Sequence, residues 1–236
     1  MMALKKAEKV KSIYRAEQEI IGKDSSFAII EAYKTIRTNL MFALPKHGCK
    51  KIILTSASPK EGKTCSAINL ALTLALMNTR VLLIDCDLRR ASIHRIMKLK
   101  GIPGLSEMLG GMEQLSDIIQ STMSPTLKVI CAGTLPPNPA ELLGSDEMGE
   151  LLAELEPDYD YILMDTPPVN VVADALTLSK ISDGVIMIAR GGETTHKELS
   201  KALSSLKFAD ARLLGIIMND MENGGSFGYK RYHYGS

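Results

Sequence analysis

The sequence predicts an open, doubly wound α/β domain with a mostly parallel sheet. From Lys51 onward, short and continuously apolar runs alternate with longer segments that have helical periodicity. Such runs are typical of parallel strands, because helices cover both faces of a parallel sheet and bury every side chain. Right-handed crossovers then give an open sheet whose ligands bind at the carboxyl ends of the strands.

Composition narrows the classes of protein further. The chain has 236 residues, of which 45% are hydrophobic and 23% charged, as in ordinary globular domains. The net charge of +1 provides no global positive field, so we expect no nucleic-acid partner. No apolar run approaches the roughly 18 to 20 residues of a membrane span. The four cysteines lie far apart, which argues against a disulfide framework or a zinc site.

The order of elements follows from the apolar runs and the segments between them. A first helix is expected over 26–43, where apolar residues recur at three- and four-residue intervals before Pro45. Six strands are expected, at 52–55, 81–85, 127–132, 161–165, 184–189 and 213–218. The other expected helices lie at 63–79, 92–98, 104–120, 139–155, 171–180 and 194–209.

No repeat or low-complexity linker divides this region, so one domain is expected over 25–220. Residues 1–24 are polar and lack sustained periodicity, and we expect a flexible arm there. Residues 221–236 are rich in Gly, Ser and Tyr, which predicts a mobile tail.

A phosphate-binding loop follows the first strand. Residues 57–64 read Ala-Ser-Pro-Lys-Glu-Gly-Lys-Thr, which is G-x-x-x-x-G-K-[ST] with Ala57 in place of the first glycine. Strand, loop and helix occur in the required order, so the loop amides and the helix N-terminus form an anion-binding concavity. Lys63 then supplies a cation to the β- and γ-phosphates, and the Thr64 hydroxyl is positioned to bind Mg²⁺. This predicts a P-loop NTPase fold with ATP and Mg²⁺; the alternative is a lysine-bearing turn before an ordinary helix.

Carboxylates end two of the other strands. Asp85 closes the second strand and Asp87 follows it, so both point the same way at the edge where the phosphates lie. Asp165 closes the run YILMD, as the second metal-site carboxylate of P-loop enzymes does. We expect them to hold Mg²⁺ or accept a proton; alternatively, each caps the following helix. Arg89 is placed to reach phosphates, or else to form a surface salt bridge.

Together these motifs resemble the bacterial tyrosine kinases that control capsule and exopolysaccharide synthesis. The resemblance rests on the phosphate loop, Asp-Cys-Asp-Leu-Arg-Arg at 85–90, Asp-Thr-Pro-Pro at 165–168, and a terminal tyrosine cluster, in this order. Pro-Pro-Asn-Pro-Ala-Glu-Leu-Leu at 136–143 supports it. The likeness extends from about Ser26 to the C-terminus. It implies an ATP-dependent kinase that phosphorylates its own C-terminal tyrosines.

The resemblance also implies residue roles. The catalytic group would be Lys63, Asp85, Asp87 and Arg89, and the magnesium ligands Thr64, Asp85 and Asp165. The nucleotide would contact Ser58, Pro59, Lys60, Glu61, Gly62, Lys63, Thr64, Cys65 and Asn219. The phosphate acceptors would be Tyr229, Tyr232 and Tyr234, and the self-association helix would use Glu31, Lys34 and Arg37.

Partners are implied in the same way. This chain contains no transmembrane adaptor region, so a separate membrane protein with a cytoplasmic activating segment is implied, which would recruit a cytoplasmic kinase to the inner face of the membrane. Self-association into a ring-like homo-oligomer and a protein-tyrosine phosphatase are also implied. Three positions depart from the family pattern, with Lys60 for a glycine, Ala91 for a proline and Lys34 for an arginine.

Other P-loop proteins remain as alternatives. The main alternative is an ATPase switch of the chromosome-partitioning or division-site type, without tyrosine kinase activity. Those proteins carry a signature lysine where this chain has Ser58, and they lack a tyrosine-rich tail. A nucleotide-binding scaffold would be expected to lose Lys63 or the aspartates, and a small-molecule P-loop transferase would need a substrate-binding insert.

Overall fold

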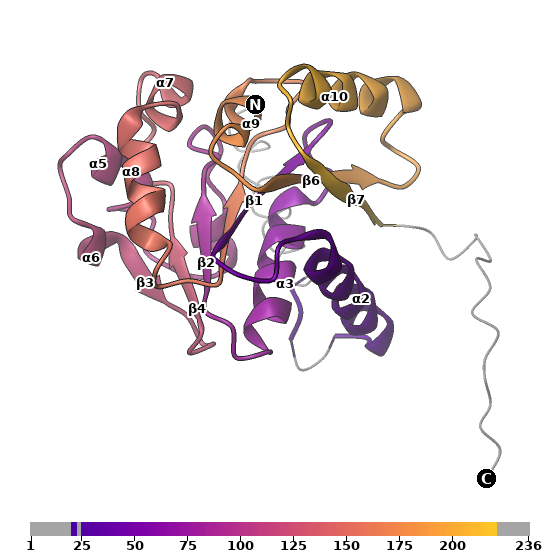
Figure 1. The fold of residues 1–236 in the computed structure, drawn as a ribbon, viewed down its shortest axis with the longest axis horizontal. Coiled ribbons are helices and arrows are strands. Elements are labelled where there is room, and N and C mark those ends of the chain that lie inside the picture. Colours follow the sequence, from indigo (N-terminus) through magenta and orange to yellow (C-terminus); the bar gives the residue numbers. More distant parts are fainter. Residues whose placement is uncertain (1–19, 23–24, 221–236) are drawn as a thin grey trace, which may run out of the picture.

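A seven-stranded sheet forms the centre of the molecule (Figure 1). The computed structural model describes residues 20–22 and 25–220. The strand order is β3-β4-β2-β5-β1-β6-β7, and all neighbours are parallel except β3 and β4. The strands are β1 (Lys50–Ser56), β2 (Val81–Asp85), β3 (Ile119–Ser121), β4 (Leu127–Ile130), β5 (Tyr161–Asp165), β6 (Gly184–Arg190) and β7 (Leu213–Asn219).

The six predicted strands and the mostly parallel sheet are confirmed. The single helix predicted over 104–120 is wrong, because this segment forms two short helices and then β3. Gly110 and Gly111 interrupt it, and Gly111 adopts a positive φ of 69° that a helix cannot continue. Strand β3 then pairs antiparallel with β4 at the edge of the sheet.

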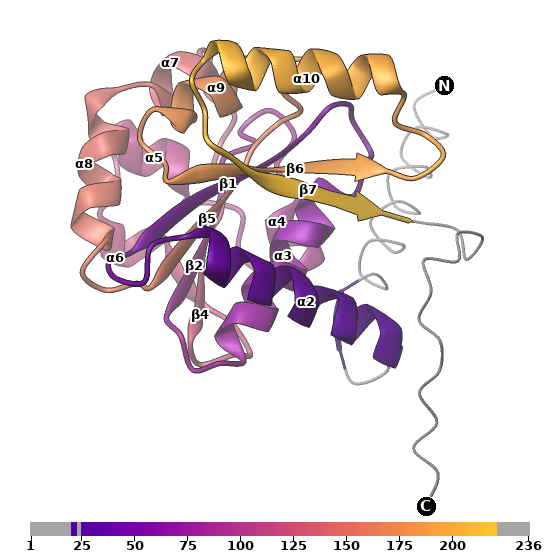
Figure 2. The same cartoon turned by 45° about the vertical axis from the view of Figure 1, so that its right-hand side comes forward.

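Helices cover both faces of the sheet (Figure 2). Helices α2 and α3 lie on one face, and α7 to α10 lie on the other (Figure 2). The segment predicted as one helix over 139–155 is broken at Gly144 and Ser145. The helices are α2 (Phe27–Ala43), α3 (Lys63–Ala75), α4 (Ile93–Ile96), α5 (Leu105–Leu109), α6 (Leu115–Ile118), α7 (Pro139–Leu143), α8 (Asp146–Leu155), α9 (Asp174–Ser179) and α10 (His196–Phe208).

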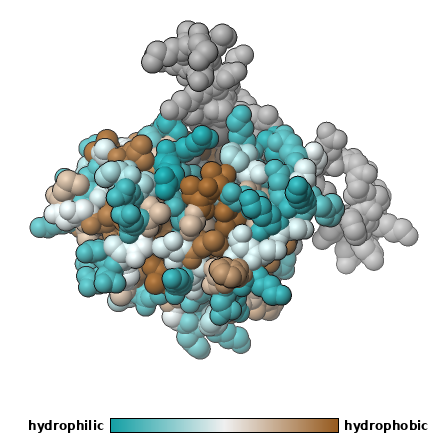
Figure 3. Space-filling view, turned by 90° about the horizontal axis from the view of Figure 1, so that it is seen from above, coloured by the Kyte–Doolittle hydropathy of each residue, from teal (hydrophilic) through white to brown (hydrophobic). Residues whose placement is uncertain are grey.

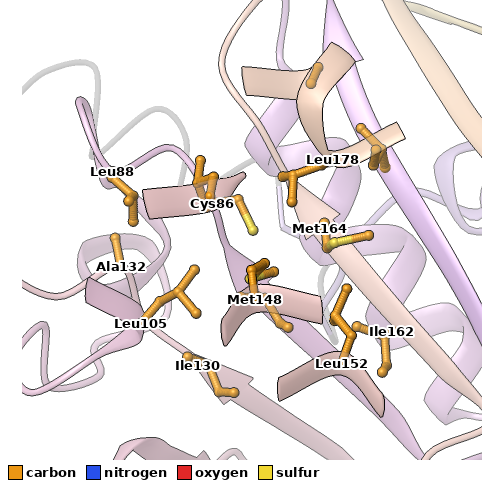
Figure 4. Close-up of a cluster of buried hydrophobic side chains, with 14 of the residues drawn as sticks. Cys86, Leu88, Leu105, Ile130, Ala132, Met148, Leu152, Ile162, Met164 and Leu178 are labelled. Carbon is orange, nitrogen blue, oxygen red and sulfur yellow. The ribbon is translucent and has the colours of Figure 1, made fainter. Parts of the chain in front are cut away.

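Two hydrophobic cores fill the spaces between sheet and helices. Alternation along β1 divides them, since Ile53 joins the core under α5 to α10 while Ile52 and Leu54 join the core under α2, α3 and α4. Figure 4 shows Met148 and Leu152 of α8 beside strand residues such as Ile162 in the first core. Burial of both faces holds the strands rigid, and so fixes the loops that leave their carboxyl ends.

The strand order brings the predicted loops together. Strand β1 lies between β5 and β6, and β2 lies beside β5. Asp85 and Asp165 are directly paired in register at the ends of β2 and β5. The phosphate loop after β1 is therefore next to both aspartate loops on one side, and to the ends of β6 and β7 on the other.

The two terminal segments are described only in part. Ile20 packs against the core under α3, and the amide of Ile21 donates to Asn69 Oδ1 at 2.8 Å. The rest of the predicted arm, and the predicted tail 221–236, lie outside the described residues. Across the part that the structure describes, no helix is both long and apolar enough to span a bilayer. Figure 3 shows a mostly hydrophilic face with a small central group of hydrophobic residues.

Candidate active site

The phosphate loop has the backbone that an anion site needs. Gly62 lies at the start of α3 with φ 83°, and a Cβ there would come within 1.9 Å of Asn219 Nδ2. The N-cap residue of α3 is Gly62, which has no side chain to cap the first amides, and a helix N-terminus of this kind favours an anion. Lys60 adopts φ 70°, a left-handed conformation that glycine adopts without strain and lysine does not.

Lys63 is buried among carboxylates at the edge of the sheet. Its Nζ lies 2.5 Å from Asp165 Oδ1 and 3.8 Å from Asp87 Oδ2. The Thr64 hydroxyl donates to the other Asp165 oxygen at 2.7 Å. Lysine, threonine and aspartate thus converge across 101 residues of sequence, as the loop motifs predict.

Burial and mutual repulsion raise the pKa of two carboxyl groups at the site. Loss of water and the charge of Asp165 raise the pKa of Asp85 to about 7. Burial also raises the pKa of Asp165, against the opposing effect of Lys63. Burial alone would lower the pKa of Lys63, but Asp165 and Asp87 outweigh it and raise the pKa. The site therefore has an excess of negative charge that a divalent cation would neutralise.

The Asp85 carboxylate accepts hydrogen bonds from the backbone of its own loop. Its Oδ1 accepts from the amide of Asp87 at 3.2 Å, and its Oδ2 accepts from the amides of Ser92 and Ile93, each at 3.1 Å. The side chain is completely buried. Asp87 is 8% exposed and lines the cavity above the phosphate loop. The magnesium and catalytic roles of Asp85 remain predictions. The structure shows in addition that its hydrogen bonds fix the loop that carries Asp87.

A cavity of about 490 Å³ lies beside Lys63, Thr64 and Asp87, which help to line it. The phosphate loop and Asp87 form its polar side, and Pro167, Pro168 and Val171 form an apolar wall. Arg89 also lines it, and its Nε lies 3.4 Å from the buried Oδ2 of Asp174. The cavity thus joins a phosphate site to a surface that suits an aromatic ring.

The opposite side of the phosphate loop is held by residues that the sequence analysis missed. Arg190 donates to the carbonyl of Lys60 at 3.1 Å and to Asp220. Thr194 donates to the carboxylate of Glu61. Arg190 is the last residue of β6 and Thr194 follows this strand, so the rule that selected Asp85 and Asp165, polar residues at the end of a strand, also applies to them. Asn219, predicted from the resemblance, donates to the carbonyl of Glu61 at 3.1 Å.

The residues predicted for self-association lie away from these loops, on α2. Lys34 Nζ and Glu31 Oε1 form a half-exposed ion pair of 2.7 Å within the helix. Arg37 donates to the carbonyl of Thr73 at 3.0 Å, so it is directed at its own α3. The predicted acceptors Tyr229, Tyr232 and Tyr234 lie outside the described residues.

Comparison with known proteins identifies the family. Residues 49–213 match a family described as an AAA domain. The tyrosine-protein kinase YwqD of Bacillus subtilis is 40% identical over 189 residues, which is 80% of each chain. The chain belongs to the bacterial tyrosine-protein kinases. Some relatives are much longer than this kinase, which spans 28% of the tyrosine-protein kinase ptk of Acinetobacter johnsonii at 38% identity over 88% of its own length.

Solved structures support the same family. The kinase domain of the Escherichia coli tyrosine kinase ETK superposes on this kinase with a TM-score of 0.80 at 35% identity, covering 88% of this kinase and 80% of that kinase domain. The chimerical protein CapA2B2 gives the same TM-score and identity, covering 84% and 87%. The septum site-determining protein MinD of Pyrococcus horikoshii, at 23% identity, 72% and 70% coverage and a TM-score of 0.62, shares the fold alone. This kinase is thus a nucleotide-binding tyrosine-protein kinase, and the switch ATPase alternative is not favoured.

Proposed function

We propose that this kinase transfers the terminal phosphoryl group of ATP to tyrosine hydroxyls, including Tyr229, Tyr232 and Tyr234 of its own chain. The observation that carries the proposal is the convergence of Lys63, Asp87 and Asp165 beneath a cavity with an apolar wall. A P-loop site without such a wall would suit hydrolysis by water equally well. The wall favours a phenol as the acceptor.

The residues present fit ATP and Mg²⁺. The loop amides and the start of α3 suit a triphosphate, and the Gly62 position lets the backbone approach it. Described residues contain no cluster of three or more His, Cys, Asp or Glu arranged for a metal. This suits Mg²⁺, which keeps several waters and phosphate oxygens and needs only one or two protein ligands. Thr64 and Asp165 would hold it, and Asp85, which is paired in register with Asp165 on the neighbouring strand, is the third predicted ligand. Bound Mg²⁺ would neutralise charge on the phosphates.

Lys63, Asp87 and Arg89 would act on the transferring group and its acceptor. Release from Asp165 would let Lys63 pair with phosphate oxygens as their charge develops. An ordinary carboxylate has a pKa near 4 and tyrosine one near 10, so full proton transfer before reaction costs roughly 8 kcal/mol. Asp87 therefore orients the hydroxyl and accepts its proton late, when bond formation has made it acidic. In a loose transition state the nucleophile needs little activation, so Asp87 need not remove the proton earlier.

The biological setting is proposed from the kinship with the bacterial tyrosine kinases. We expect this kinase to regulate capsule or exopolysaccharide synthesis or export, as a cytoplasmic protein recruited to the membrane by an adaptor with an activating segment. We also propose that the kinase forms a ring-like homo-oligomer through Glu31, Lys34 and Arg37. A protein-tyrosine phosphatase would reverse the modification, and no nucleic-acid partner is expected. Each phosphate would add about −1.5 to −2 charge to the tail, which we expect to weaken self-association.

The test is phosphorylation of the C-terminal peptide. The full chain would be incubated with Mg-ATP, with and without an activating segment from a candidate adaptor, and the peptide analysed by mass spectrometry. We expect phosphate on the tyrosines, and none in the Lys63→Met variant, which excludes contaminating kinases. ATP hydrolysis with an unmodified peptide, even beside the adaptor, would overturn the proposal. Light scattering before and after treatment tests the loss of self-association.

A further inference from the structure

Two arginines in the catalytic cavity form no ion pair with any carboxylate that the structure describes. Arg90 and Arg95 both line the cavity with Lys63 and Arg89. Lys63 is paired with Asp165, and Arg89 with Asp174. Within 20–22 and 25–220, no ion pair joins Arg90 or Arg95 to an acidic side chain. The site described above uses neither residue.

Arg95 is held next to the phosphate loop with donors to spare. The Ser92 hydroxyl lies 3.3 Å from the Thr64 hydroxyl, so the start of α4 abuts the loop, and Arg95 follows within the same helix. One guanidinium nitrogen of Arg95 donates to the carbonyl of Ala91 at 2.6 Å. Its Nε is buried and has no hydrogen-bond acceptor. A guanidinium offers five N–H donors, so most of this group's capacity is unused.

This chemistry suits a phosphate beside an aromatic ring. Arginine binds phosphate with two parallel hydrogen bonds, and buried donors favour a ligand that satisfies them. The loop amides and Lys63 already serve the nucleotide, while Pro167, Pro168 and Val171 offer the apolar wall. The arginines therefore provide for a second anion on the acceptor segment.

We infer that Arg90 and Arg95 bind a phosphate already present on a tyrosine two or three residues from the acceptor. The inference rests on the proposed function. Tyr232 and Tyr234 are two residues apart, and Tyr229 and Tyr232 three. Residues two apart in an extended segment point the same way, about 6.5 Å from each other. The sequence from Tyr229 to Ser236 contains no Asp or Glu, so a side-chain anion there requires prior modification. Phosphorylation of the cluster is then sequential, with each phosphate promoting the next.

The experiment compares synthetic peptides of residues 225–236 as substrates for the full chain. In all of them Tyr229 is replaced by Phe, and Tyr232 is the acceptor. Position 234 carries phosphotyrosine, phenylalanine or glutamate. We expect kcat/KM to be at least tenfold higher for the phosphopeptide than for the phenylalanine peptide, with glutamate between them. Arg95→Ala and Arg90→Ala would each bring this ratio close to one, and Arg95→Lys would retain part of it. Lys100→Ala removes an exposed cation from outside the cavity and would leave the ratio unchanged.

A second measurement separates this inference from the proposed function. Binding of the same fluorescent peptides with Mg-ADP present, followed by anisotropy, reports the anion subsite without any turnover. A wild-type preference for the phosphopeptide that Arg95→Ala removes supports the subsite even if no phosphate is transferred. Equal binding of the phosphotyrosine and phenylalanine peptides would overturn the inference, as would an Arg95→Ala variant that loses ATP affinity while keeping the preference. That result would assign the arginines to the nucleotide.

Discussion

The side-chain amide of Asn219 donates to the backbone carbonyl of Glu61 at 3.1 Å, and thereby joins the end of β7 to the phosphate loop. The same amide lies where a side chain at Gly62 would have to go. One contact across 158 residues thus fixes the loop and requires a glycine next to it. The phosphate site is in this way built from both ends of the domain.

Replacing Gly62 by alanine is expected to abolish nucleotide binding. The added Cβ would collide with Asn219 Nδ2, and alanine is strained at φ 83°. Isothermal titration with ATP and Mg²⁺ measures the loss, which we expect to exceed tenfold. The double variant Gly62→Ala with Asn219→Ala removes the collision and leaves the strain, so it should regain thermal stability more than affinity. Full recovery of affinity would show that the backbone conformation is unimportant.

Replacing Lys60 by glycine is expected to stabilise the protein by about 1 kcal/mol, because a non-glycine residue pays about that amount in a left-handed conformation. Urea unfolding of the nucleotide-free protein measures the difference. Lys100→Gly is the matched control: Lys100 is not among the residues with positive φ, so glycine there should be neutral or destabilising. A loss of stability in Lys60→Gly would contradict the assignment of strain.

Removal of the Lys63 charge is expected to destabilise the fold more at pH 8 than at pH 6. Breaking a buried ion pair costs roughly 3 to 5 kcal/mol, because the remaining charge is left without a partner. Burial raises the pKa of Asp165 and Lys63 lowers it, so in Lys63→Met the Asp165 carboxyl would bind a proton more readily at the lower pH and so reduce that cost. Thermal unfolding at both pH values measures this. Adding Asp165→Asn should restore most of the stability, and a pH-independent loss would argue against the charge cluster.

Asp85→Asn is expected to gain stability relative to the wild type as the pH rises from about 4 to about 7. The folded protein holds a proton on Asp85 up to about pH 7, while the unfolded chain releases it near pH 4. Wild-type stability from this group is thus present below pH 4 and lost as the pH approaches 7. Asparagine does not ionise and has no such dependence. Chemical unfolding across this range tests it, and a constant difference between the two proteins would refute it.

Most of the fold follows from the sequence because parallel strands must be apolar on both faces. The runs that end at Asp85 and Asp165 are confirmed as strands, and a parallel sheet places the ends of both at one edge. That β2 and β5 are direct neighbours is known only from the structure. Strand β3 was missed, because Ile119 continues an apolar pattern that also suits a helix. Only its antiparallel pairing with β4 decides the conformation.

The candidate site was predicted less completely than the fold. Local motifs identified Lys63 and Thr64, since one loop contains them. Arg190 and Thr194 contact the loop only because β6 lies beside β1, which is a property of strand order and not of local sequence. The hydrogen bonds that Asp85 accepts from the amides of its own loop depend in the same way on how residues 86–93 turn back.

The position of β7 has a consequence for biosynthesis. Asn219 ends β7 and Asp220 follows it, yet they secure a loop that begins near position 57. During translation, a chain that has emerged only as far as α10 contains Lys63 and every aspartate of the site but cannot close the site. Competence to bind nucleotide should therefore arise abruptly, when the final strand leaves the ribosome and adds to the sheet.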